Sequence, residues 1–176
     1  MAGLQSLLRA MVPTSRSPRE VLSRIHRLYR HNSRFTTFVS VFLMAVDLPR
    51  RELSYVNAGH NPPALVRPDP GLRTSLTWLM PTGPALGLTE EAEYAERTVP
   101  FGESDMLTIY TDGIPELFDL KGEQFGQDRL EALLREAAPV PAPEAVRIVR
   151  EELQGFIGEH PPSDDITLIV LRGTGS

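Results

Sequence analysis

The chain has 176 residues, of which 41% are hydrophobic and 23% charged, and it contains no Cys. This length and composition are typical of one globular domain, and they exclude a disulfide framework, a thiolate zinc site and a cysteine nucleophile. The longest apolar stretch, Phe38 to Val46, is shorter than the roughly 18 residues of a membrane span, and residues 1–10 lack a signal-peptide pattern. A cytoplasmic location is therefore expected.

The net charge of −5 is unevenly distributed along the chain. Residues 1–51 hold nine Arg and two acidic residues, a net +7, whereas residues 52–176 hold nine basic and 21 acidic residues, a net −12. The basic segment is interpreted either as a solvated helix face or as a surface that attracts an anionic partner. The acidic remainder argues against nucleic-acid binding.

Two helices are predicted at the start of the chain. Apolar residues at helical spacing predict the first helix, which Pro13 ends: Leu4, Leu7, Leu8 and Met11. Residues 17–20 read as a capping box with Pro18 at the first helical position, so a second helix begins there. Its predicted apolar face consists of Leu22, Ile25, Leu28 and Tyr29.

Strands and two further helices are predicted for the rest of the chain. Phe35 to Val46 has two mainly apolar faces, which predicts a strand in the middle of a sheet, and residues 68–92 are expected to be mostly loop. The other predicted strands are 53–58, 64–67, 94–99, 106–110 and 166–171, and the other helices are 126–137 and 143–157. This order predicts an α+β fold in which helices pack against an antiparallel sheet or sandwich.

Acidic residues lie at the ends of two predicted strands. Asp112 follows the strand 106–110, and the pair Asp164 and Asp165 precedes the strand 166–171. If these strands are antiparallel neighbours, the acidic residues meet, and their oxygen donors suit Mg²⁺ or Mn²⁺. The alternative is ordinary loop chemistry, because Asp-Gly is a common turn signal.

Two loops are further candidates. Gly59, His60 and Asn61 form a turn in which His60 could contact a phosphate or act as an acid, or could simply hydrogen-bond the turn. The segment PTGPALGL at 81–88 could form a backbone bend, but it lacks the Lys of a phosphate-binding loop. Neither a zinc-protease nor a serine-hydrolase motif is present in the sequence.

Five segments together resemble the metal-dependent PPM family of protein serine/threonine phosphatases, in its bacterial SpoIIE-like branch. They occur in the family's order: FTTFVSVFLMAVD at 35–47, LSYVNAGHNPPALV at 53–66, PTGPALGL at 81–88, LTIYTDGIPELFDLKGEQFG at 107–126 and DDITLIVLR at 164–172. The resemblance implies a PPM-type α-β-β-α sandwich with a two-metal site. It also implies hydrolysis of phosphoserine or phosphothreonine by a metal-activated water.

The resemblance assigns roles to several residues. Asp112 of TDG and Asp164 of DDIT match the family's metal-binding aspartates and are the expected catalytic pair. Asp165 ranks behind them as a ligand, since related enzymes often carry Asn there, and Gly113 is a further candidate ligand. Gly59, His60 and Asn61 are expected to shape a loop near the site.

The resemblance also implies partners. The expected substrate is a phosphorylated anti-sigma-factor antagonist, whose dephosphorylation switches a stress or developmental sigma factor. An upstream sensor domain is expected, but no nucleic acid and no membrane span. Uncovered sheet edges would favour a homodimer.

One departure from the family concerns the metal site. The family begins with two strands and a Gly-Asp-Val-x-Gly-His-Gly motif whose Asp bridges two metals, and this chain contains no such motif. Residues 1–176 are therefore interpreted as a single, N-terminally truncated phosphatase domain lacking its first strands. The complete domain would bind two Mn²⁺ or Mg²⁺ ions, and this chain one or none, with little hydrolysis. The alternatives are a catalytically dead pseudo-phosphatase that binds a phosphoprotein, and a metal phosphoesterase acting on small molecules.

Overall fold

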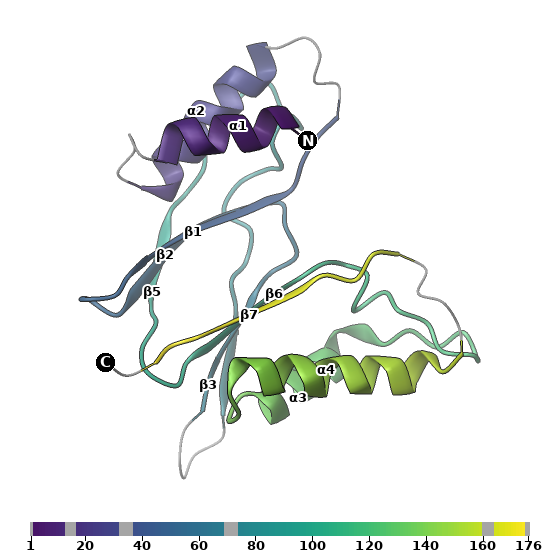
Figure 1. Ribbon diagram of the computed structural model, residues 1–176. Helices are drawn as coiled ribbons and strands as arrows, with labels where there is room; N and C mark the ends of the chain where they lie inside the picture. The colour runs from purple at the N-terminus through teal and green to yellow at the C-terminus, as the bar shows by residue number, and fades with distance from the viewer. Residues whose placement is uncertain (1, 13–16, 32–36, 69–73, 160–163, 175–176) are drawn as a thin grey trace. The chain divides into compact units, whose positions relative to one another are not determined.

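A computed structural model describes residues 2–12, 17–31, 37–68, 74–159 and 164–174 (Figure 1). The described residues form four helices and seven strands. They divide into two compact units, the first comprising residues 1–60 and 80–101 and the second residues 61–79 and 102–176. Each unit combines an antiparallel sheet with a helix pair, which confirms the predicted α+β class.

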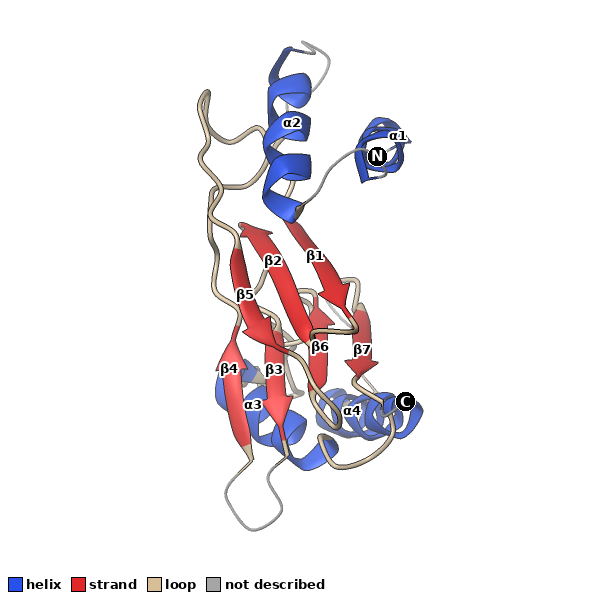
Figure 2. Cartoon of the chain, turned by 90° about the vertical axis from the view of Figure 1, so that its left-hand side faces the viewer, coloured by secondary structure: helices blue, strands red, loops and turns tan. Residues whose placement is uncertain are grey.

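The first unit has a sheet of order β1-β2-β5, drawn in red in Figure 2. Its strands are β1 (Val41–Asp47), β2 (Glu52–Ala58) and β5 (Arg97–Pro100). Both neighbouring pairs are antiparallel, with Val41 opposite Ala58 and Glu52 opposite Pro100. Helix α2 (Pro18–His31) packs against β1 and β2, and α1 (Ala2–Met11) packs against α2.

Helix α2 begins as the sequence predicts. The backbone N–H of Glu20 donates to Ser17 Oγ at 3.3 Å, which satisfies one of the free donors of the first turn. Leu22 and Ile25 are fully buried in the core of the unit, but Leu28 is 43% exposed. The apolar face of α2 is therefore narrower than predicted. The prediction that Pro13 ends α1 lies outside the described residues.

Strand β1 differs from its prediction in start and position. It begins at Val41 rather than at Phe35; residues 35–36 are outside the described part of the chain. The backbone of Val39 pairs instead with Leu86 through two N–H···O bonds of 2.9 Å, and the pairing of β1 with β2 begins at Val41. In the described structure β1 is an edge strand, and its side chains are half-buried or exposed rather than buried on both faces.

The second unit has an antiparallel sheet of order β4-β3-β6-β7. Its strands are β3 (Ala64–Arg67), β4 (Ser75–Trp78), β6 (Met106–Tyr110) and β7 (Leu168–Arg172). β4 lies in a segment predicted to be mostly loop, because four residues carry too little periodicity to reveal a strand. Its pairing with β3, which sets Ala64 opposite Trp78, gives the backbone groups of β4 their hydrogen-bond partners.

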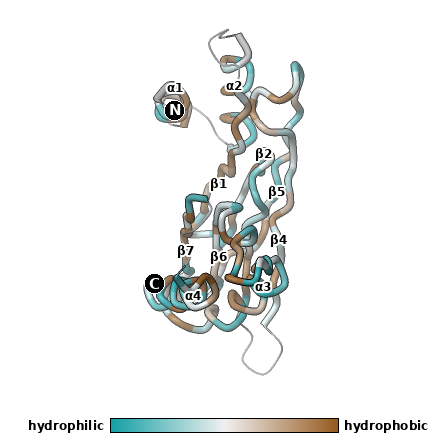
Figure 3. The backbone as a smooth tube through the Cα atoms, turned by 90° about the vertical axis from the view of Figure 1, so that its right-hand side faces the viewer, coloured by the Kyte–Doolittle hydropathy of each residue, from teal (hydrophilic) through white to brown (hydrophobic). Residues whose placement is uncertain are grey.

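Helices α3 (Gly126–Ala137) and α4 (Ala142–Ile157) complete the second unit. Helix α3 contacts β3 and β4, and α4 contacts β7 and α3. Figure 3 shows teal and brown segments along both helices, as expected for helices with one apolar face. Those faces bury Leu130, Leu134, Val149 and Leu153 against the sheet residues Val66, Met106 and Tyr110. No helix in the described ranges is both long and apolar enough to cross a membrane.

Candidate metal centre

Two acidic turns meet at one end of the β6–β7 pair. The strands are antiparallel, and their register sets Tyr110 at the end of β6 opposite Leu168 at the start of β7. The chain therefore leaves β6 towards Asp112 at the same end where it arrives at β7 from Asp164. This confirms the expectation that the two predicted strands are antiparallel neighbours.

The turn after β6 is built around Asp112 and Gly113. The carbonyl oxygen of Thr111 accepts the N–H of Ile114 at 3.1 Å, and that of Asp112 accepts the N–H of Glu116 at 3.0 Å. Gly113 is buried, and a Cβ added to it would lie 2.6 Å from the carbonyl oxygen of Asp165. The close approach of the two turns therefore depends on the missing side chain.

The turn before β7 leaves carboxylate oxygens available. Asp164 Oδ1 accepts the N–H of Asp165 at 2.7 Å, and the Asp165 carbonyl oxygen accepts the Thr111 hydroxyl at 3.0 Å. Asp112, Asp164 and Asp165 are all exposed. Among the described residues, no hydrogen bond or ion pair engages the carboxylate of Asp112 or Asp165. These oxygens are free to bind a cation or water.

The donor set fits a hard divalent cation. Every candidate side-chain donor in the two turns is a carboxylate oxygen, the ligand type preferred by Mg²⁺ and Mn²⁺. Within the described ranges, no group of three or more His, Cys, Asp or Glu side chains is arranged to hold a metal ion. As a metal site, the two turns would therefore supply only part of a coordination shell.

The strand end that carries the first turn is firmly anchored. Tyr110 is buried, its hydroxyl accepts a hydrogen bond from Gln127 Nε2 at 3.3 Å, and its ring meets that of Trp78 edge to face at 6.2 Å. Burial raises the pKa of Tyr110, so its hydroxyl stays protonated at neutral pH. Asp112 thus projects from a rigid element.

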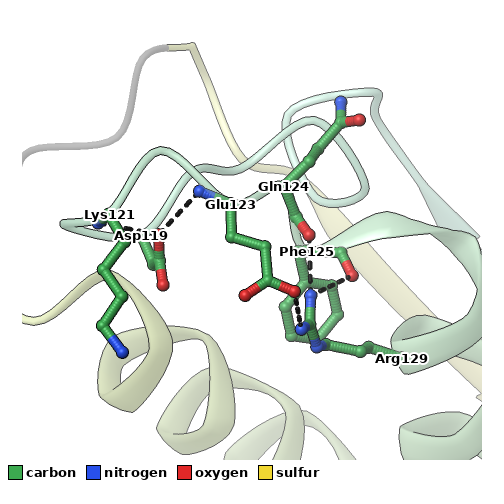
Figure 4. A network of polar contacts seen from close by, with 6 residues as sticks. All are labelled: Asp119, Lys121, Glu123, Gln124, Phe125 and Arg129. Atoms are coloured by element: carbon green, nitrogen blue, oxygen red, sulfur yellow. Dashed lines mark hydrogen bonds and ion pairs between the residues drawn. The ribbon is translucent and has the colours of Figure 1, made fainter.

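The segment that follows the Asp112 turn is braced by a polar network (Figure 4). Asp119 Oδ1 accepts the backbone N–H groups of Glu123 at 2.8 Å and Lys121 at 2.9 Å. The hydrogen bond from Glu123 is the main reason why the pKa of Asp119 lies below its usual range. Arg129 of α3 donates to the carbonyl oxygens of Gln124 and Phe125, at 2.7 and 3.2 Å.

Gly59 and His60, the first two residues of the candidate loop, belong to the first unit. Gly59 has a φ of +70°, and a Cβ there would lie 3.1 Å from the Ala85 backbone nitrogen. The N–H of His60 donates to Asn57 Oδ1 at 2.9 Å, and its ring lies 6.4 Å from that of Phe42. His60 therefore takes part in ordering its own turn.

The role of this loop at the metal centre stays a prediction. Gly59 and His60 belong to the first unit, and Asn61 belongs to the second together with the acidic turns. The roles of Asp112, Gly113, Asp164 and Asp165 as ligands also stay predictions. Sequence reasoning missed Thr111, because a Thr at a strand end is common and only the tertiary pairing shows what its hydroxyl contacts.

The comparisons with known proteins agree with this architecture. The chain is 31% identical over 134 residues to the Protein IcfG of Synechocystis, covering 76% of this chain and 20% of that protein. It is 29% identical over 127 residues to the phosphoserine phosphatase RsbP of Bacillus subtilis, covering 66% of this chain and 30% of that protein. The solved SiaA-PP2C domain of Pseudomonas aeruginosa has 26% identity and a TM-score of 0.76, covering 97% of this chain and 66% of that one.

Two antiparallel sheets, each with its helix pair, and the similarity to the solved SiaA-PP2C domain define a PP2C-type (PPM) phosphatase fold. The family of Stage II sporulation protein E matches residues 1–174, so the chain belongs to this SpoIIE family. The predicted fold class and the predicted family are both confirmed. The chain spans only a fifth to a third of the length of the two curated relatives described above.

Proposed function

We propose that this chain carries part of the metal site of a phosphoprotein phosphatase that hydrolyses phosphoserine or phosphothreonine on a regulatory protein. The observation that carries this proposal is the antiparallel pairing of β6 and β7, which brings the TDG and DDIT turns to one strand end. Membership of the SpoIIE family and similarity to a phosphoserine phosphatase support it. The resemblance to the SpoIIE-like branch supports an anti-sigma-factor antagonist as the substrate class.

In this proposal Asp112 and Asp164 hold Mn²⁺ or Mg²⁺ through carboxylate oxygens, with Asp165 and Gly113 as further candidate ligands. The bound metal would lower the pKa of a water molecule and offset the charge of the phosphoryl oxygens. The bond from the Asp165 N–H orients the Asp164 carboxylate and leaves its second oxygen for the cation. The missing side chain of Gly113 lets the two turns approach each other.

A second candidate is a catalytically dead phosphoprotein-binding module. It is favoured by the absence, among the described residues, of a group of three or more metal-binding side chains. Such a module would bind a phosphorylated segment without releasing phosphate. The expected sensor domain, homodimer and cytoplasmic location stay predictions under either candidate.

The two candidates can be separated with the full chain. We expect weak Mn²⁺ binding, measured by the loss of the free-ion signal in electron paramagnetic resonance. Loss of a residue that only orients a metal ligand weakens metal affinity by about 10- to 100-fold. D112N and D164N change the ligands themselves, so we expect them to weaken Mn²⁺ binding by about 100-fold or more. D128N, at an exposed position in the first turn of α3, is the matched control and should bind Mn²⁺ like the wild type.

Phosphate release from a phosphoserine peptide is then measured with Mn²⁺ present. Phosphate release by the wild type that is lost in D112N supports the phosphatase. Binding of the peptide by the wild type without phosphate release supports the phosphoprotein-binding module. Release from nucleotides but not from the peptide would favour a small-molecule phosphoesterase. Equal Mn²⁺ binding by wild type, D112N and D164N would contradict a metal site at these turns.

A further inference from the structure

The hydroxyl of Thr111 sits at the junction of the two acidic turns. It donates to the carbonyl oxygen of Asp165 at 3.0 Å and accepts the backbone N–H of Thr167, also at 3.0 Å. The N–H of Thr111 donates to the carbonyl oxygen of Thr167 at 3.2 Å. The side chain and the backbone of Thr111 thus make three hydrogen bonds to two residues, one to Asp165 and two to Thr167, in the segment that leads into β7.

The backbone explains why a hydroxyl is needed at this position. A hydrogen-bonded pair in an antiparallel ladder normally exchanges two N–H···O bonds. Beyond Tyr110 and Leu168, the carbonyl oxygen of Thr111 turns away to accept the N–H of Ile114. The Thr111 hydroxyl receives the N–H of Thr167 in its place, so pairing extends one step while the Asp112 turn begins.

A second contact acts on the same carbonyl group. The Cα of Gly113 approaches the Asp165 carbonyl so closely that a Cβ there would lie 2.6 Å from the oxygen. The Asp165 peptide is therefore held by a hydrogen bond from Thr111 and by close packing against Gly113. In the sequence, Asp112 lies between Thr111 and Gly113, and Asp164 directly precedes Asp165. Both candidate ligands are therefore adjacent to residues that these contacts hold in place.

We propose that Thr111 is a positioning residue of the metal site: its hydroxyl locks the Asp164–Asp165 backbone to the Asp112 turn and sets the separation of the two carboxylates. This inference rests on the proposed function. The groups that Thr111 bonds lie at exposed residues, so water can satisfy them when the hydroxyl is lost. Removal should therefore loosen the site more than it destabilises the fold.

The test compares T111V, which keeps the branched shape but lacks the hydroxyl, with T111S, which keeps the hydroxyl. We expect T111V to lose about 10- to 100-fold in Mn²⁺ affinity, the range for residues that orient metal ligands. T111S should bind like the wild type. T77V, an exposed Thr-to-Val change on β4 of the same sheet, is the control for the substitution itself and should leave Mn²⁺ affinity unchanged.

Hydrogen exchange of the Thr167 amide gives a readout that needs no metal. We expect protection in the wild type and T111S, and rapid exchange in T111V, at similar thermal unfolding midpoints. Protection of this amide in T111V, or equal Mn²⁺ affinities of T111V and wild type, would overturn the positioning role. If the wild type bound no Mn²⁺, the proposed function would fail, while amide exchange would still decide whether Thr111 holds the two turns together.

Discussion

Gly113 is a position where a single missing side chain shapes the candidate site. It is not among the glycines with positive φ, so its conformation is open to other residues. The demand for glycine comes instead from the carbonyl group of Asp165, which leaves no room for a Cβ. The Asp-Gly pair predicted a turn, but the contact with a residue more than 50 positions later is a tertiary feature.

The G113A variant should be clearly destabilised. A Cβ at 2.6 Å from a backbone oxygen must displace one of the two turns, at a cost of about 1–3 kcal/mol in the free energy of unfolding. Mn²⁺ binding should weaken as well. Urea unfolding monitored by circular dichroism measures the first effect.

The matched control is G155A in helix α4, where an added Cβ would meet no atom within 4 Å. Because Ala favours helix more than Gly, this variant should gain about 0.5–1 kcal/mol. If G113A were as stable as the wild type, the close approach of the two turns in the structure would be wrong.

At the scale of elements, the loop between the Asp112 turn and α3 is held by α3 itself. Arg129 bonds two loop carbonyls and pairs with Glu123 (Figure 4). Its guanidinium group also lies 5.3 Å from the centre of the Phe156 ring of α4. The ion pair with Glu123 is exposed, and exposed pairs contribute about 0–1 kcal/mol. The carbonyl bonds and the ring contact should therefore dominate.

The comparison of R129A with E123A tests which contacts matter. We expect R129A to lose about 1–2 kcal/mol of unfolding free energy, because the charged donor and the cation–π contact are both removed. E123A should lose about 0.5 kcal/mol or less, since only the exposed pair disappears. Equal losses of unfolding free energy in the two variants would mean that the ion pair with Glu123 is the main contribution of Arg129 to stability.

At the scale of the whole molecule, the two units carry different charges. The residues of the first unit have a net charge of +3 and those of the second −8. The basic start of the chain is partly balanced within its own unit, because the acidic segment 90–96 packs on α2. Glu96 accepts the N–H of Arg19 at 3.0 Å, and the carbonyl oxygen of Glu90 lies 3.5 Å from His26 Nε2.

Tyr94 of this acidic segment makes the first unit sensitive to alkaline pH. It is 3% exposed, its hydroxyl lies 3.2 Å from Nδ1 of the buried His26, and burial raises its pKa to about 12. An unfolded Tyr loses its proton near pH 10, before the folded one does. Above pH 10 the unfolded state therefore binds fewer protons, and stability falls as pH rises through about 12.

The variant Y94F isolates this effect. At pH 8 it should be less stable than the wild type by about 1–3 kcal/mol, because Nδ1 of the buried His26 loses its hydrogen-bond partner. The gap should narrow above pH 10, since only the wild type has to keep Tyr94 protonated. Urea unfolding at pH 8 and pH 11 measures the difference in unfolding free energy between the two proteins. A difference that does not change with pH would contradict the proposed effect of the raised Tyr94 pKa.

The amino-acid sequence by itself determined the local structure and the family. Helical spacing, the N-cap bond at Ser17 and the strand Met106–Tyr110 follow from neighbouring residues, and the structure confirms them. The motifs TDG and DDIT, in the family's order, identified the fold class and the candidate ligands. These features are readable because each depends on residues close together in the chain.

The tertiary structure decided what depends on distant partners. It placed β1 at a sheet edge, added β4, and revealed Thr111, whose hydroxyl bonds the carbonyl group of a residue 54 positions away. No local pattern encodes such a contact, because it exists only once β6 and β7 have paired in register. The sequence thus determined which acidic residues are candidate ligands, and strand pairing decided that their turns meet.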